Sequence, residues 1–142
     1  MAALSAPKII EFEGEQEEIS PKVAASDTYY KGGILCYVSG YAAAPGDNAN
    51  SEVAGIVTGH FEGGERDDAL AVGTTPIRAR LKRGKAWIAV SGAAITDVGV
   101  IHYVADDQTM TKTAGSKTVG YRALDFKPGY LMFDFRHPDR IA

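Results

Sequence analysis

Cysteine and long apolar runs are both scarce in this sequence of 142 residues. Its one cysteine, Cys36, cannot form a disulfide within the chain, so nothing in the fold depends on an oxidising compartment. No apolar run approaches the roughly 20 residues that span a bilayer. The N-terminus also lacks the apolar core that is typical of a signal peptide. We therefore expect a protein that is made in the cytosol, without a disulfide or a membrane span.

Helical patterning is missing as well, and the composition favours strands. The sequence has 10 Val, 10 Ile and 9 Thr against 6 Leu, together with 16 Gly. β-Branched residues suit the pleated surface of a sheet, and no long stretch keeps the 3.6-residue apolar period of a helix. A chain of this length fits one domain. We predict a mostly β protein with a single small barrel-like or sandwich-like domain.

Short strand patterns, separated by Gly, Asp and Asn, begin near residue 26. Ile34–Val38 and Val53–Thr58 have the pattern of strands, whereas Gly63–Thr75 has that of a long polar loop. Ile77–Lys82 and Lys85–Val90 predict a hairpin, with its turn at Arg83-Gly84. In the first limb of this hairpin, apolar and basic residues alternate, so one face would be apolar and the other basic. The basic residues of that limb are Arg78, Arg80 and Lys82.

An internal repeat organises the chain. The hexapeptide Gly-Ile-Leu-Cys-Tyr-Val at residues 33–38 returns as Gly-Val-Ile-His-Tyr-Val at residues 99–104, which is 66 positions later. Val53 and Val119 share this offset, and each copy ends in an alternating strand. We interpret the chain as two related β units, at about residues 28–82 and 94–136, that pack into one domain.

Residues with catalytic potential are few. The three histidines and the one cysteine show no spacing that is typical of a zinc site. His102 takes the repeat position that Cys36 holds in the first copy, which predicts a packing role. Gly115–Thr118 lacks the glycines of a phosphate-binding loop, and no nucleophile motif such as G-x-S-x-G occurs. The sequence therefore predicts no catalytic, cofactor-binding or metal-binding residue, and a protein that is not an enzyme.

The apolar positions of the strand patterns predict the core. These positions either alternate with polar residues or form short continuous runs. We expect largely buried side chains at Leu35, Tyr37, Val53, Ile77, Leu81, Trp87, Ile88, Ile101, Tyr103, Val119 and Phe133.

Residues 1–25 have the composition of an extended acidic arm, and residues 26–142 that of the β domain. Five of the eight Glu of the chain lie between Glu11 and Glu18. Such a segment buries too little apolar surface to offset the entropic cost of ordering it. The arm would therefore be mobile in the free protein and would order on a partner. Its candidate anchors are Ile9, Ile10, Phe12 and Ile19.

Charge is divided unevenly along the chain. Residues 1–70 carry 12 acidic and 4 basic side chains, a net charge of −8, whereas residues 71–142 carry 6 and 11, a net charge of +5. A chain so divided can attract a copy of itself or a partner of matching pattern. Two solvated faces of opposite sign are the alternative explanation.

Residues 28–136 resemble the phage capsid cement, or head decoration, proteins of the DUF2190 type. The family pattern has two copies of a glycine, a short strand that ends near Tyr, a polar turn, a V-x-G-x-A-like strand and an alternating strand. The second copy is the better match, at residues 96–104, 118–124 and 129–133. The first copy matches at Lys31–Val38 and Val53–Val57, while both ends of the chain lie outside the resemblance.

This resemblance implies a structural virion protein that binds the outer capsid surface at capsomer junctions and stabilises the shell. Its partners would be the major capsid protein and further copies of itself, with a trimer favoured over a dimer, and it would be made in the host cytoplasm. Cofactors, membranes and nucleic acid are not expected. The rival interpretation is a nucleic-acid-binding module that uses the basic strand Arg78–Lys85, and a third is a small enzyme without a recognisable motif. The candidate contact residues are Ile9, Ile10, Phe12, Ile19, Arg78, Arg80 and Lys82.

Overall fold

The protein is mostly β, as its composition predicts, and its main sheet curls into a half-barrel. The computed structural model describes residues 8–23, 28–43, 52–61, 65–66, 71–72, 78–115, 117 and 119–140. The predicted core residue Ile77 and most of the loop Gly63–Thr75 lie outside this set. In the described part, no helix is long and apolar enough to cross a membrane. The elements are β1 (Glu11–Ile19), β2 (Thr28–Tyr29), β3 (Ile34–Val38), β4 (Tyr41–Ala43), β5 (Val53–Phe61), β6 (Glu65–Arg66), β7 (Ala71–Val72), β8 (Arg78–Ala89), the 3-10 turn η1 (Ile95–Asp97), β9 (Ile101–Val104), β10 (Met110–Thr111), β11 (Val119–Lys127), β12 (Tyr130–Asp134) and β13 (Asp139–Arg140).

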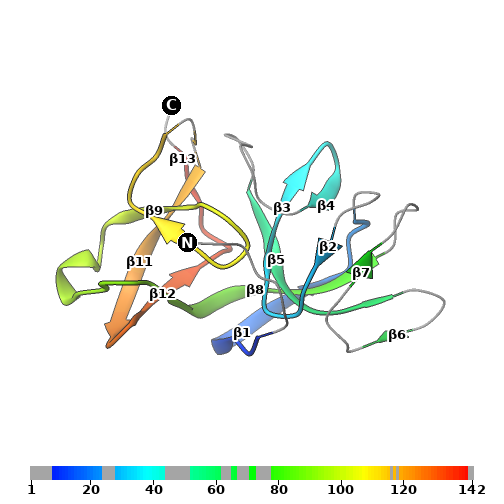
Figure 1. The fold of residues 1–142 in the computed structure, drawn as a ribbon, viewed down its shortest axis with the longest axis horizontal. Coiled ribbons are helices and arrows are strands. Elements are labelled where there is room, and N and C mark those ends of the chain that lie inside the picture. Colours follow the sequence, from blue (N-terminus) through cyan, green and yellow to red (C-terminus); the bar gives the residue numbers. More distant parts are fainter. Residues whose placement is uncertain are drawn as a thin grey trace.

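Two similar sets of strands meet in the middle of the main sheet. The strand order is β10-β9-β11-β12-β8-β5-β3-β4, and β8 and β12 pair antiparallel at the centre (Figure 1). The two hexapeptides lie in β3 and β9, each between a short hairpin partner and a longer strand. Two related units joined edge to edge would give this order. The common origin of the units stays a prediction.

The registers of the two units differ in one respect. Leu35 of β3 lies opposite Gly55 of β5. Its counterpart in β9, Ile101, lies opposite Arg122 of β11, which is two positions beyond the equivalent glycine, Gly120. The two units therefore share their strand order without sharing every pair of opposed residues.

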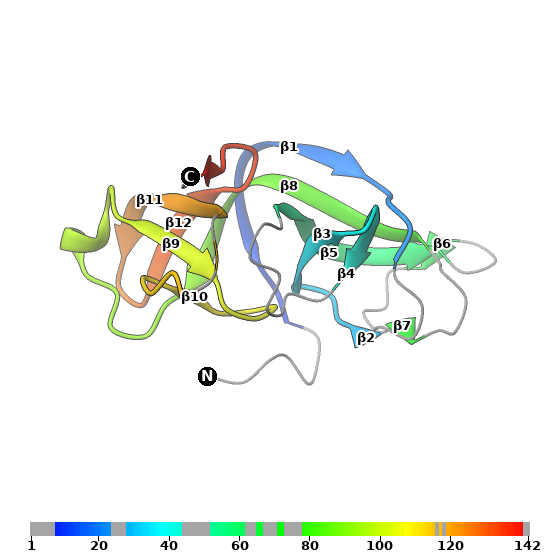
Figure 2. The same ribbon diagram turned by 90° about the horizontal axis from the view of Figure 1, so that it is seen from above.

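β8 is a single strand of 12 residues, so the predicted hairpin at Arg83-Gly84 is wrong. Its first half pairs with β5 and its second half with β12 on the same edge, so β8 bridges the two units (Figure 2). The apolar residues change phase along the strand: Leu81 packs into one core cluster and Ala86 into the other. This phase change resembles a turn in the sequence.

Residues 11–19 of the expected arm form β1, which corrects the expectation that this segment stays apart from the domain. β1 runs antiparallel to β8 on the edge opposite to β5 and β12 (Figure 2). A Cβ atom at Gly84 would lie 2.7 Å from the side-chain oxygen of Gln16, so this glycine leaves room for the Gln16 amide, which donates a hydrogen bond to the Lys85 carbonyl. Composition alone does not predict β1, because backbone pairing with β8 and the opposite charges on β8 add to the few apolar contacts that β1 makes.

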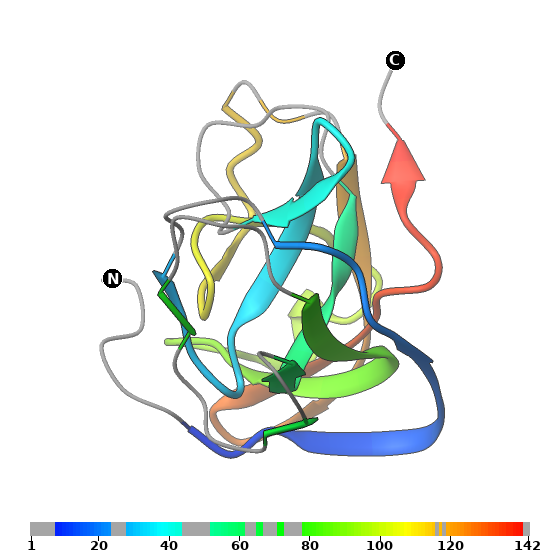
Figure 3. The same ribbon diagram turned by 90° about the vertical axis from the view of Figure 1, so that its right-hand side faces the viewer.

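Two hydrophobic clusters lie on opposite faces of the β3–β5 pair. One cluster fills the inside of the curl between the two units and includes Ile34, Ile56 and Phe133. The other includes Leu35, Leu81 and the fully buried Tyr29. Seen end-on, the strands of the main sheet follow an open curl (Figure 3). Alternate residues of β3 therefore enter different cores, as the period of a strand requires.

Most of the predicted core is buried. Tyr37 and Ile101 are exceptions, because both are only half-buried. Tyr37 lies in β3 next to the edge strand β4, and Ile101 is the first residue of β9. The predicted core residues that are buried are Leu35, Val53, Leu81, Trp87, Ile88, Tyr103, Val119 and Phe133.

Candidate interaction surface

The acidic strand β1 lies directly on the basic strand β8. Glu18 is opposite Lys82, Glu17 is opposite Arg83, and Glu13 is opposite Lys85. The Arg83 guanidinium also contacts the Glu17 carboxylate at 3.4 Å. Cross-strand pairs of opposite charge stabilise a sheet by a few tenths of a kcal/mol, roughly. Part of the negative charge of residues 1–70 is thus balanced by the positive charge of β8 in the same chain.

The predicted basic contact residues are therefore only partly available. Arg78 is exposed, and its guanidinium donates a hydrogen bond to the Ser20 carbonyl at 2.8 Å. Arg80 and Lys82 are half-buried, and the Lys82 ammonium lies 5.5 Å from the centre of the Phe12 ring. The structure does not present these residues as an open basic stripe, which weakens the interpretation as a nucleic-acid-binding module.

Three of the four predicted apolar anchors pack against their own domain. Ile10 and Phe12 pack against the cluster inside the curl, and Ile19 packs against the other cluster. Ile9 differs, because 94% of its surface is exposed. Among the predicted anchors, Ile9 is thus the one that remains fully open to a partner.

A second surface, which the sequence does not reveal, lies on the outside of the sheet where β1, β8 and β12 run together. Glu11, Trp87 and Met132 form one row of opposed residues, and Ala89 and Tyr130 form the next. Residues opposed in a row, or two positions apart on a strand, share a face. We call these five residues, with Ile9 and Lys127 at their edge, the outer face.

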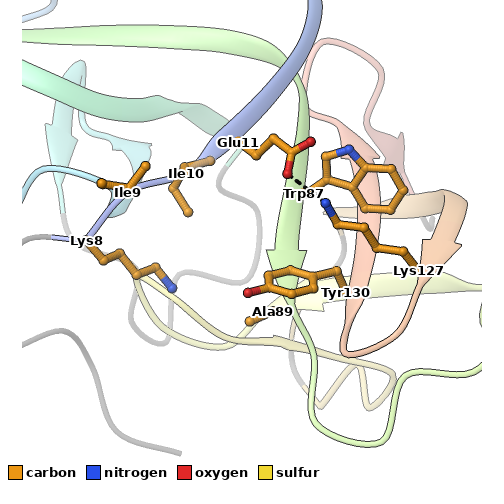
Figure 4. A pocket seen from close by; sticks show the side chains of 8 residues that line it. All are labelled: Lys8, Ile9, Ile10, Glu11, Trp87, Ala89, Lys127 and Tyr130. Atoms are coloured by element: carbon orange, nitrogen blue, oxygen red, sulfur yellow. Dashed lines mark hydrogen bonds and ion pairs between the residues drawn. The ribbon is translucent and has the colours of Figure 1, made fainter.

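Trp87 is covered on this face by an ion pair. The Lys127 ammonium contacts the Glu11 carboxylate at 2.6 Å and lies 4.6 Å from the centre of the Trp87 ring (Figure 4). It also lies 5.2 Å from the Tyr130 ring. The Trp87 indole N–H donates to Glu13 at 3.0 Å. Because these polar groups cover it, Trp87 is only 8% exposed although it points away from the core.

Beside Trp87 the outer face is hollowed. The hollow has a volume of about 360 Å³. Ile9 stands at its rim, while Ile10 and Tyr130 line it (Figure 4). Lys8 also lines it; burial lowers the pKa of this ammonium, and Asp107 and Asp106 act in the opposite direction. The complete lining is Lys8, Ile9, Ile10, Glu11, Trp87, Ala89, Lys127 and Tyr130.

The buried carboxylate Asp134 has a structural role beside this face. Arg136 donates to both of its oxygens, at 3.0 and 2.9 Å. Burial raises the pKa of the Asp134 carboxyl, but the hydrogen bonds and charge of Arg136 outweigh burial and hold that pKa below its usual range. Asp134 is thus a paired anion in the fold.

His102 and Cys36 both pack in the interior, as the repeat predicts for His102. The His102 ring lies edge-on to Phe133 at 5.3 Å, and its Nδ1 atom is 2.9 Å from the Val100 carbonyl oxygen. Burial raises the pKa of the Cys36 thiol to about 12, which disfavours the reactive thiolate. In the described part of the chain, no three potential ligands are placed to hold a metal ion.

Sequence reasoning missed the outer face because its members come from three separate segments of the chain. Lys127 and Tyr130 belong to a short hairpin, and nothing in their spacing indicates a tryptophan 40 positions earlier. One usable signal was the continuous apolar run Ala86–Val90, which would be buried on both faces if the sheet were covered on both sides. Ala89 is in fact exposed and Val90 is half-buried.

Comparison with known proteins identifies the fold. No family model and no curated protein matches the chain. A chain of "The capsid of Myoviridae Phage XM1" is similar in structure, with a TM-score of 0.51 and 14% sequence identity. The match covers 95% of this chain and 91% of that one. The protein thus shares the fold of a chain in a phage capsid, a likeness that does not single out the DUF2190 type.

Proposed function

We propose that the protein is a structural component of a phage virion. In this proposal it binds the outer surface of the capsid at junctions between capsomers and stabilises the shell. The observation that carries the proposal is the fold, because the likeness to a phage capsid chain extends over 95% of this chain rather than over one motif. The sequence resemblance to cement proteins points to the same class independently.

The physical basis of such a role is mass action. A protein that binds the assembled shell and not its loose subunits shifts the equilibrium towards assembly. Each contact can be modest, since many equivalent sites on one shell act together. The major capsid protein is the proposed partner, and the protein would reside on the outside of the virion after synthesis in the host cytoplasm.

Co-sedimentation tests this proposal. The purified protein is mixed with expanded, undecorated heads of its phage, with unassembled capsid protein, and with duplex DNA. We expect saturable binding to the heads, binding to loose capsid protein at least tenfold weaker, and little binding to DNA. Salt-dependent binding to DNA without binding to heads would instead support the nucleic-acid-binding module.

A further inference from the structure

The outer face combines a projecting apolar side chain with a hollow. Ile9 is the most exposed of the large hydrophobic residues in the described chain, at 94%. It stands at the rim of the 360 Å³ hollow that Trp87, Ala89 and Tyr130 help to line. Burial of such an exposed isoleucine by a partner lowers the free energy by about 25 cal/mol for each Å² of apolar surface removed from water.

The charges on this face occur as opposite pairs. Glu11 contacts Lys127 at 2.6 Å, and Glu13 lies opposite Lys85. Lys8, at the other side of the hollow, has Asp106 and Asp107 nearby. A face with balanced charges gives no advantage to a strongly acidic or strongly basic partner. A second copy of the chain carries the same balance of acidic and basic groups and is therefore a suitable partner.

We propose that the outer face is a self-association surface, on which Ile9 of each copy enters the hollow of the other. A projection and a hollow side by side on one face are self-complementary. A twofold axis that lies in the plane of the face, midway between them, brings each projection onto the partner's hollow. The contact is closed after two copies, because each copy uses both features at once. This pairing favours a dimer over the trimer that was expected from the sequence.

The covered position of Trp87 agrees with this arrangement. The Lys127–Glu11 ion pair covers the indole ring of Trp87. Association of two copies through this face would therefore leave the ion pair intact. Tyr130 is 41% exposed and contributes an aromatic ring at the rim. Tyrosine and isoleucine side chains around a small hollow are a suitable centre for a modest interface.

Two matched pairs of variants test the proposal. Ile9→Glu places a charge at the centre of the proposed contact, and Ile95→Glu places one at another exposed isoleucine, 65% exposed, in η1. Tyr130→Glu is the second test, and Tyr41→Glu is its control. The two tyrosines are similarly exposed, at 41% and 37%, but Tyr41 lies in β4 at the far end of the sheet. Circular dichroism establishes that each variant is folded.

Sedimentation velocity over a range of concentrations measures the association. We expect the wild type to form a dimer. The dimer dissociation constant should be at least tenfold higher for Ile9→Glu and Tyr130→Glu, which corresponds to about 1.4 kcal/mol. For the two controls it should change by less than threefold. A wild type that stays monomeric up to millimolar concentration would overturn the proposal. Equal weakening by Ile9→Glu and Ile95→Glu would overturn it too.

The proposal is separable from the capsid role. Self-association is measured on the free protein, whereas decoration is measured on heads. A monomeric wild type that sediments with heads would overturn the pairing and leave the capsid role standing. A dimer that depends on Ile9 and ignores heads would keep the pairing and contradict the capsid role.

Discussion

The backbone N–H of Val53 donates a hydrogen bond to the phenolic oxygen of Tyr121 at 2.8 Å, inside the protein. Val53 begins β5 in the first unit, and Tyr121 lies in β11 of the second. This bond therefore joins the two units through the core. Burial raises the pKa of Tyr121, so the hydroxyl stays protonated at any physiological pH.

Removing this hydroxyl should weaken the contact between the units. Tyr121→Phe leaves the Val53 N–H buried without a partner, at a cost of about 1–3 kcal/mol. Urea unfolding at neutral pH measures the loss. Tyr130→Phe, which removes an exposed hydroxyl on the neighbouring strand, is the control and should change stability by less than about 0.5 kcal/mol. Equal stability of Tyr121→Phe and wild type would show that the bond contributes nothing.

Trp87→Ala should destabilise the protein by roughly 3–5 kcal/mol. The substitution removes a large buried side chain and its hydrogen bond to Glu13, and it leaves the Lys127–Glu11 pair over a void. Thermal unfolding measures the effect. A melting temperature within a degree or two of the wild type would mean that Trp87 is peripheral to the fold.

Gly120 allows β11 and β9 to pack closely. A Cβ atom at this position would overlap the Ile101 Cγ2 atom and lie 3.0 Å from the Tyr103 ring. Gly120→Ala should therefore cost about 1–3 kcal/mol. A double-mutant cycle with Ile101→Ala, which removes the overlapping methyl group, provides the control. We expect part of the cost to be recovered in the double variant, and strictly additive losses would contradict this explanation.

Asp134 should make stability depend on acid pH. Its pKa is lower in the folded state than in the unfolded chain, where an Asp titrates near 3.9. The stabilisation is thus complete above about pH 5 and is lost as the pH falls through the folded-state pKa. Melting temperatures between pH 7 and pH 2 should fall less steeply for Asp134→Asn than for the wild type. A slope for Asp134→Asn equal to that of the wild type would contradict this role of Asp134.

Deleting residues 2–20 distinguishes a strand from a mobile arm. The deletion removes β1 and leaves one edge of β8 without its partner. The contact of Phe12 with the core is also lost. We expect a loss of several kcal/mol, or a melting temperature lower by roughly 10 °C or more. An unchanged melting temperature would support the mobile arm that the composition suggested.

The sequence predicts strands well where their pattern is local. Ile34–Val38 matches β3 in full, because a short continuous apolar run after a glycine is typical of a strand that is covered on both faces. β8 was misread because its two halves contact different cores, and a phase change in one strand looks the same as a turn between two. β1 was missed because the residues that stabilise it lie on β8, far away in the sequence, and include basic residues opposite its glutamates.

The candidate site was even less accessible from the sequence. Ile9 was expected as a contact residue and is fully exposed, but the hollow beside it depends on Trp87 and Tyr130, which come from other strands. Register decides which residues share a face, and a shift of one position would move Trp87 into the core. Contact surfaces built from several strands therefore require coordinates.

Electron cryomicroscopy of decorated heads shows directly whether the protein binds the outer surface of the capsid. Expanded heads that lack the protein are saturated with it, and the map is compared with that of undecorated heads. We expect added density on the outer surface, at junctions between capsomers, into which this half-barrel fits. If the maps are identical, or if the added density lies inside the shell, the protein is not an outer cement protein.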